Sequence, residues 1–382
     1  MAKIILKVNN RKFSGWENIS VTHSMTAFAG SFTVQATNLS FDKRMRYFGI
    51  HNGDEVRLEY NGRLMIYGHI DSIDVSYDGD SHSMTISGRD KTADLVDCSY
   101  VSRDVTVTLG GETKVVNNFF KKQNVLSVIK TLAKPFDITV KADPAVESIL
   151  SSEIAKAANG GKFAISQGVS VSEEIAMLGG VYGFLALSRG DGDLYLTTAG
   201  NLLSPGKLKI GSKKGPGNII SGSMNSDDTN RFRSYVVKGQ GGLSDFADLV
   251  DITEPQGIAE DIVARSVRTK VIIEEDLTDS GKAKIRAKWE ARIRASNSRT
   301  FNYKVFGWSP FVDSDIWRIN TLVEVKDAFF SIDTQYLISD ITFSLGEGGE
   351  VVDMTLVPSA SFDIKKRKIK AVSNGLDVLK GA

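Results

Sequence analysis

The chain has a single cysteine, Cys98, among its 382 residues. An intrachain disulfide framework and a multi-cysteine zinc site are therefore both excluded. Only four histidines occur, all in the first 82 residues and without the spacing of a metal-ligand pair: His23, His51, His69 and His82. Proline is scarce at 7 residues, whereas glycine reaches 35. That balance is more typical of many strands joined by glycine turns than of a loop-rich chain.

Net charge and long apolar runs are also missing. The 47 lysines and arginines nearly cancel the 46 acidic residues, which leaves a formal charge of +1 and no overall attraction to nucleic acid or membrane. The longest uncharged stretch, residues 175–188, is interrupted by Gly179 and Gly180. A spanning helix needs about 20 apolar residues, so we expect no membrane insertion by this chain and synthesis in a reducing cytoplasm.

Alternating polar and apolar residues predict that residues 1 to about 90 are mainly strands. Glu55–Tyr60 alternates, Asn61 and Gly62 form a two-residue hairpin signal, and a second strand returns over residues 63–75. A short helical pattern over residues 91–97 closes this unit.

The pattern changes to mixed α/β between residues 99 and 215. Asn124 is a candidate helix cap, and Ser170 with Glu173 has capping-box spacing. Strand patterns resume at residue 231 and continue to residue 357, interrupted by a helix over about 279–295. Its expected apolar stripe recurs every four residues: Ile285, Trp289 and Ile293. The fold class predicted from these patterns is mainly β with α+β insertions.

Two segments of the chain resemble each other. In each, an alternating strand precedes an apolar strand, a glycine-containing acidic turn and a strand that begins with Met-Thr. If these segments are copies, residues 54–88 and 321–356 form the same strand–turn–strand unit in two different domains. Met84 would then correspond to Met354, and Ile86 to Leu356. Pairing of both units in one shared sheet would argue against duplication.

Motifs for catalysis are weak throughout. Cys98 has no histidine partner in sequence, and Gly200–Lys207 has five residues between its glycines where a phosphate-binding loop needs four. Asp313 and Asp315 could serve a glycosidase only at a carboxylate separation that sequence does not give. Two basic features could contact nucleic acid or an acidic protein: the helix near residues 282–294 and the run at residues 365–370.

Residues 86–98, Ile-Ser-Gly-Arg-Asp-Lys-Thr-Ala-Asp-Leu-Val-Asp-Cys, resemble the baseplate hub proteins of contractile-tailed phages and prophages. The family is that of the Mu-type 43 kDa tail protein. Further matches follow in family order at residues 231–232, 235–240, 286–290, 305–308 and 316–323. The resemblance spans roughly residues 15 to 360.

This resemblance implies two similar β-barrel-like domains plus α/β and helical inserted regions. Residues 1–98 would form the first such domain and residues 99–215 an α/β domain. Residues 216–361 would form the second, with a loop and helix insertion at about 244–299, followed by a basic polar tail at 362–382.

The implied function is that of a structural baseplate hub in the virion tail, made in the bacterial host cytoplasm and without catalytic site, metal or cofactor. A ring of this kind connects the sixfold tail tube to the threefold central spike and leaves a channel for DNA. The implied partners are further copies of the chain in a homotrimer, the central spike protein, tail tube or adaptor proteins and other baseplate proteins. DNA would be present only in transit.

Two groups of residues are candidates for these roles. The family-motif residues, expected to be structural, are Gly88, Arg89, Asp90, Lys91, Trp289, Trp308 and Trp317. The possible partner contacts are Lys365, Lys366, Arg367 and Lys368. Two alternatives stay open: a tail-associated peptidoglycan hydrolase, which zymography would reveal, and a nucleic-acid-binding module that uses the basic helix, which a salt-dependent DNA shift would reveal.

Overall fold

The structure is a computed structural model in which the described part of the chain is residues 4–37, 49–78, 82–100, 106–109, 112–115, 123–153, 168–211, 216–239, 255–274, 280–311 and 314–363. The basic run at Lys365, Lys366, Arg367 and Lys368 lies outside these residues, as does the acidic Asp313. None of the described helices combines the length and apolar character needed to cross a membrane.

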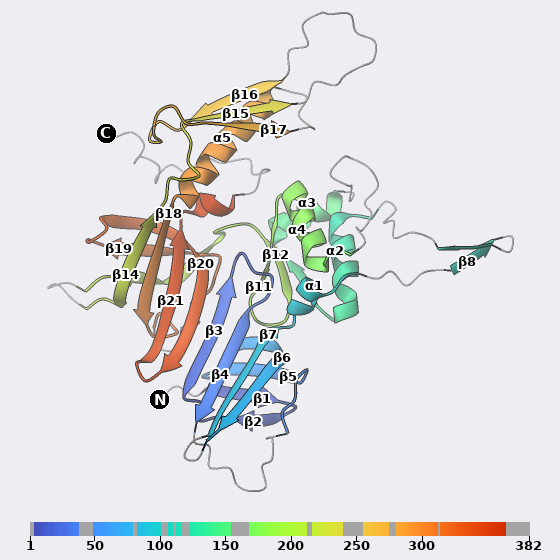
Figure 1. Ribbon diagram of the computed structural model, residues 1–382, viewed down its shortest axis with the longest axis vertical. Coiled ribbons are helices and arrows are strands. Elements are labelled where there is room, and N and C mark those ends of the chain that lie inside the picture. Colours follow the sequence, from blue (N-terminus) through green and yellow to red (C-terminus); the bar gives the residue numbers. More distant parts are fainter. Residues whose placement is uncertain are drawn as a thin grey trace, which may run out of the picture.

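One large sheet of 13 strands dominates the molecule (Figure 1). Its pairing order is β14-β18-β21-β20-β3-β4-β7-β6-β5-β1-β2, and β19 joins β20 while β13 joins β19. The strands from the first part of the chain are β1 (Ile4–Val8), β2 (Arg11–Phe13), β3 (Asn18–Ser24), β4 (Ser31–Thr37), β5 (Glu55–Tyr60), β6 (Arg63–Tyr77) and β7 (His82–Asp90). Those from the later part are β13 (Leu202–Lys209), β14 (Ile219–Ser226), β18 (Arg299–Phe306), β19 (Thr321–Asp327), β20 (Ile332–Gly346) and β21 (Gly349–Val357). The prediction of a mainly β fold is confirmed.

The β5–β6 hairpin turns where the sequence predicted. Asn61 has φ 49° and Gly62 has φ 80°. Both residues tolerate the left-handed region that a two-residue hairpin requires. Glu59 then pairs with Leu64 and Tyr60 with Arg63, so the alternation in β5 faces Val56, Leu58 and Tyr60 into the core.

Two runs of six strands share one pairing order within this sheet. The first is β3-β4-β7-β6-β5-β1 and the second is β14-β18-β21-β20-β19-β13. The central strands β6 and β20 each have 15 residues, with a bulge after Ile70 in one and after Ile338 in the other. The runs differ at their last pair, which is antiparallel for β1–β5 and parallel for β13–β19. We call these runs the first and second sheet units.

The expectation of two separate sheets is wrong. β3 of the first unit pairs with β20 of the second, so both units belong to one sheet. The duplication argument drawn from the sequence therefore fails, and what the two units share is the pairing order and the position of the bulge. Because the strand pairs are open at β2 and β14, the described strands form no closed barrel.

The bulges also correct the expected equivalence of residues. Ile70 pairs with Gly88 and Ile338 with Leu356, which makes Gly88 the counterpart of Leu356. The same offset aligns Ile86 with Met354. The sequence had suggested Leu356 as the counterpart of Ile86, so the expected alignment was two residues out. Met84 and Met354 nevertheless both point into the buried core, because a shift of two residues preserves the face of a strand.

A compact α/β region lies beside the first unit (Figure 1). Its helices are α1 (Ala93–Asp97), α2 (Val125–Ala133), α3 (Pro144–Ser152) and α4 (Val171–Tyr182), and the short 3-10 helix η1 (Lys134–Phe136) follows α2. Its small sheet contains β10 (Val140–Ala142), β12 (Leu194–Thr197) and β11 (Leu185–Ser188), while β8 (Thr106–Leu109) pairs with β9 (Glu112–Val115). Both predicted caps are confirmed: Asn124 accepts from the Ser127 amide at 2.8 Å, and Ser170 with Glu173 forms a capping box.

A second small sheet carries the long helix. It consists of β16 (Gln256–Glu260), β15 (Ser234–Gly239) and β17 (Thr269–Glu274), and α5 (Ser280–Asn297) packs against it. The 3-10 helix η2 (Ser359–Phe362) contacts α5. The expected stripe on α5 is wrong at Ile285, which is 64% exposed, whereas Ala283 and Ala287 are fully buried. The small side chains of these alanines allow α5 to approach β16 closely. The approach also requires glycine at position 257 of β16, because a Cβ there would lie 2.0 Å from the Lys284 backbone nitrogen.

We predict that Gly88→Ala destabilises the fold. A Cβ at Gly88 would lie 2.1 Å from the His69 carbonyl oxygen and 2.8 Å from the Phe32 ring, and a backbone oxygen inside a ladder cannot move away cheaply. The unfolding free energy, measured in denaturant, should fall by about 3 kcal/mol.

The matched control is Gly180→Ala in α4, where an added Cβ meets nothing within 4 Å. That variant should be neutral or more stable by up to about 1 kcal/mol, because alanine favours a helix. Equal stability of both variants would contradict the close packing of β6 on β7.

Candidate functional site

The Gly-Arg-Asp-Lys motif lies where the large sheet meets the α/β region. Asp90, at the end of β7, is 1% exposed and accepts four hydrogen bonds. Its Oδ2 accepts from the Gly30 amide at 2.7 Å and from the Ser188 hydroxyl at 2.6 Å. Its Oδ1 accepts from the Thr92 amide at 2.9 Å and from the Thr92 hydroxyl. Asp90 thus ties the loop before β4, the start of α1 and the end of β11 to one carboxylate.

Burial raises the pKa of Asp90, and these hydrogen bonds oppose that effect. A raised pKa in a buried carboxylate can mark a catalytic acid. Here all four donors belong to the protein itself, however, and they occupy both oxygens. Asp90 therefore has a structural role: it stabilises the contact between the three segments that donate to it.

The two basic residues of the motif bind acidic partners on either side of it. Arg89 pairs with Asp71 at 2.7 Å through Nε and with Asp97 at 2.7 Å through Nη2. Lys91 donates at 2.7 Å to both the carboxylate and the carbonyl oxygen of Asp137, which follows η1. These contacts hold α1 and the α2–β10 connection against β6 and β7.

His23 lies beside this junction and was not identified as important from the sequence. It is buried on β3, beside the Met65 backbone. Added Cβ atoms at Gly30 and Gly190 would both lie 2.6 Å from its ring, so the ring fills the space that two glycines leave. Burial lowers the pKa of His23 to about 4.

The motif tryptophans are structural in different places. Trp308 is fully buried, donates to the Ser344 carbonyl at 3.0 Å and contacts the Tyr60 ring at a centroid distance of 4.8 Å. Tyr60 in turn donates to Glu350 at 2.7 Å, so β5 of the first unit is fastened to β21 of the second.

The other two tryptophans act further from the junction of the units. Trp317 donates to the Gly307 carbonyl at 3.3 Å and is 1% exposed. Trp289 on α5 donates to the Asp363 carbonyl at 2.9 Å, while the Arg286 guanidinium lies 4.4 Å from its ring centre. The motif residues therefore stabilise several separate contacts and do not form one site.

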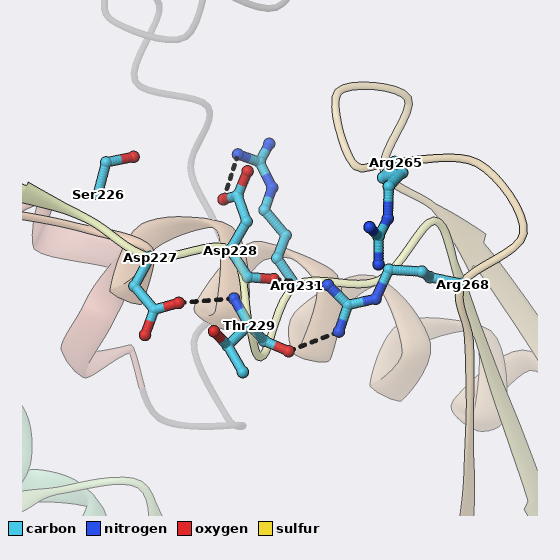
Figure 2. A pocket seen from close by; sticks show the side chains of 7 residues that line it. All are labelled: Ser226, Asp227, Asp228, Thr229, Arg231, Arg265 and Arg268. Carbon is cyan, nitrogen blue, oxygen red and sulfur yellow. Dashed lines mark hydrogen bonds and ion pairs between the residues drawn. The ribbon is translucent and has the colours of Figure 1, made fainter.

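A pocket of about 460 Å³ opens at the end of β14 (Figure 2). Its lining residues are Ser226, Asp227, Asp228, Thr229, Arg231, Arg265 and Arg268. Asp227 accepts from the Thr229 amide at 2.7 Å, and Arg268 donates to the carbonyl oxygens of Asp228 and Thr229. Arg231 forms a buried ion pair with Asp261 at 2.6 Å. Asp227, Arg231 and Arg268 are therefore each bound by groups of the protein itself.

Of the acidic pair weighed for glycosidase chemistry, only Asp315 lies within the described residues. Asp315 lies at a distance of 3.9 Å from Arg63 and 3.8 Å from Arg318, as an exposed ion pair. Across the described part of the chain, no three metal-binding side chains come together.

The basic helix carries less free charge than its sequence suggests. Glu290 is buried and binds both Arg286 and Arg294, and Arg292 pairs with Asp363 at 3.1 Å. Three of its six basic residues therefore have acidic partners. This weakens the nucleic-acid alternative.

Two family models match the chain. Residues 3–90 match the N-terminal domain described as Mu phage baseplate assembly protein GpP-like, and residues 279–365 match the fourth domain of Mu phage baseplate assembly protein GpP. The first matched segment contains all six strands of the first sheet unit, and the second contains β18, β19, β20 and β21 of the second unit.

Three relatives extend the similarity to almost the whole chain. The baseplate hub protein gp44 of Escherichia phage Mu is 28% identical over 98% of this chain and 94% of its own length. The 43 kDa tail protein of prophage MuSo2 from Shewanella oneidensis has a TM-score of 0.76 at 26% identity, covering 95% of this chain and 99% of that one. A tail protein from Neisseria meningitidis MC58 shares the fold at a TM-score of 0.71 and 19% identity, covering 94% and 99%.

By these matches the chain is similar to phage-tail baseplate proteins. Within that class it resembles the Mu-type baseplate hub proteins along nearly its full length, which confirms the recognition made from the Gly-Arg-Asp-Lys motif.

We predict that His23 makes the fold acid-sensitive. Because its folded pKa is about 4 against 6.5 for a free histidine, the unfolded chain takes up a proton first as the pH falls. This stability is fully present above pH 6.5 and is lost as the pH falls towards 4. Between pH 7.5 and 5 the loss should be about 2 kcal/mol, measured by denaturant unfolding.

His23→Gln should remove this part of the pH dependence. His51→Gln, at an exposed position, is the matched control and should leave it unchanged. If His23→Gln and the parent protein lose equal stability over this range, His23 is not the group responsible.

Proposed function

We propose that the chain is the structural hub of a contractile-tail baseplate, forming a homotrimeric ring between the sixfold tail tube and the threefold central spike. The observation that carries this proposal is the similarity to the phage Mu baseplate hub protein over 98% of the chain, and the two sheet units with one pairing order agree with it. Symmetric assemblies reuse one surface in every subunit. Three chains with two units each present six similar surfaces on one side while keeping threefold symmetry overall.

The proposed domains follow the boundaries expected from the sequence. Residues 1–98 and 216–361 would be two barrel-like domains of the ring, with the α/β domain at 99–215 and the insertion at about 244–299 attached to it. β15 precedes this insertion and pairs with β16 and β17, which supports an insertion that begins nearer residue 234.

The proposed role is non-enzymatic. The buried carboxylate of Asp90 is satisfied by protein donors, and in the pocket at the end of β14 Asp227 accepts from the Thr229 amide while Arg231 pairs with Asp228 and Asp261. A tail-associated peptidoglycan hydrolase is the alternative, and no specific contact favours it. The proposed partners are the spike, the tail tube or adaptor and other baseplate proteins, with DNA passing only in transit.

The chain should be a trimer in solution. Light scattering at micromolar concentration should give three times the chain mass of 41.6 kDa. The physical reason is that a single chain leaves strand edges open, and open edges favour association. A monomer at every concentration up to 100 µM would contradict the proposed ring.

A further inference from the structure

The contact between the two sheet units within the chain has a defined register. Beyond its bulge, β20 pairs with β21 on one edge and with β3 on the other. Phe343 lies opposite Val21, and both are fully buried. The Ser24 hydroxyl donates to Asp340 at 2.5 Å, and the hydroxyls of Thr22 and Thr342 are 3.1 Å apart.

The counterparts of these two strands in the other units have open edges. β6 corresponds to β20, and beyond its bulge it pairs only with β7 among the described strands. β14 corresponds to β3 and, among the strands that the structure describes, pairs only with β18. β6 therefore has an open edge that corresponds to the edge of β20 in the internal contact. β14 has an open edge that corresponds to the edge of β3.

We propose that the outer half of β6 in one copy of the chain pairs antiparallel with β14 of a second copy, in the register of the β20–β3 contact. The bulges align Phe343 with Val75, and the β3–β4 and β14–β18 registers align Val21 with Met224. Val75 therefore lies opposite Met224 of the second copy. In the same register, Ser76 lies opposite Ser223 of the second copy. Asp74 lies opposite Asn225 of the second copy, and Ser72 lies opposite Asp227.

Exposure supports this register. Val75 is 49% exposed and Met224 is 47% exposed, although their counterparts Phe343 and Val21 are fully buried. Association would cover both apolar side chains, as the internal contact already does. The Ser72–Asp227 pair would repeat the Ser24–Asp340 hydrogen bond with the two residue types exchanged between strands.

Beyond the register shift between Ile219 and Ser221, β14 also lacks the devices that keep edge strands from pairing. Its sequence Ile-Ile-Ser-Gly-Ser-Met-Asn-Ser has no charge and no proline over eight residues. Natural edge strands are commonly protected by lysine, by proline or by a bulge that turns the edge away. An uncharged, exposed edge of this length favours another strand as its occupant.

The two edges differ, so the contact is head-to-tail and each copy uses one edge of each kind. Such contacts close into a ring or continue as a filament. The number of three copies rests on the proposed hub function, whereas the register rests on the internal contact alone.

Cysteine pairing tests the register. In the internal contact the Met25 amide donates to the Ser339 carbonyl at 2.8 Å, which makes Thr22–Thr342 and Ser20–Ser344 the closely spaced, non-hydrogen-bonded pairs. Ser76 and Ser223 correspond to Ser344 and Ser20. In a Cys98→Ser background, Ser76→Cys with Ser223→Cys should form an interchain disulfide on mild oxidation, since this pair offers the short Cβ separation that a disulfide needs.

Non-reducing gels should show covalent trimers for the double variant, and only covalent dimers for an equimolar mixture of the two single variants. Six strands lie between β14 and β6 in the sheet order, and the mixture excludes a bond within one chain. The matched control, Ser76→Cys with Met224→Cys, is one residue out of register and should not cross-link.

The outcomes separate this inference from the proposed function. A trimer by light scattering without cross-linking, or with equal cross-linking of the out-of-register control, would overturn the β6–β14 contact and leave the hub in place. A monomer without cross-links would overturn both.

Discussion

The strand pairing between β20 and β3 is the interaction on which the rest of the structure depends. It joins residues more than 300 positions apart, from Asp340–Leu345 to Ile19–Ser24, and makes two sheet units into one sheet. Because side chains alternate along a strand, a slip of one residue would turn Phe343 and Val21 from the core to solvent. The single apolar core that runs through both units therefore fixes this register.

The family motif supports that sheet from one side. Asp90 holds the loop before β4, α1 and β11 together, and His23 fills the space between Gly30 and Gly190 at the same junction. Trp308, Tyr60 and Glu350 fasten the units at a second place. Residues that look like candidates for chemistry in the sequence are thus placed to hold parts of the fold together.

Local features of the fold could be predicted from the sequence, because their causes are local. The Asn61-Gly62 turn, the Asn124 cap and the Ser170–Glu173 capping box each depend on residues within a few positions of one another. The sequence also indicated two similar strand units, but it placed them in two different domains and aligned them two residues out.

Features that depend on a distant partner were not predictable. Which face of α5 is buried depends on Gly257 of β16, whose open backbone admits Ala283 and leaves Ile285 in solvent. The shared sheet and the two-residue correction at Met354 depend on pairings that no local pattern contains. His23 gave no signal because burial, not sequence spacing, makes it unusual.

Hydrogen exchange across a dilution series tests the central claim most directly, that one strand contact serves both within and between chains. Amides of β3 should be protected at every concentration, whereas those of β14 and the outer half of β6 should gain protection together as the assembly forms. Fast exchange of β14 amides in a fully assembled sample would contradict the account.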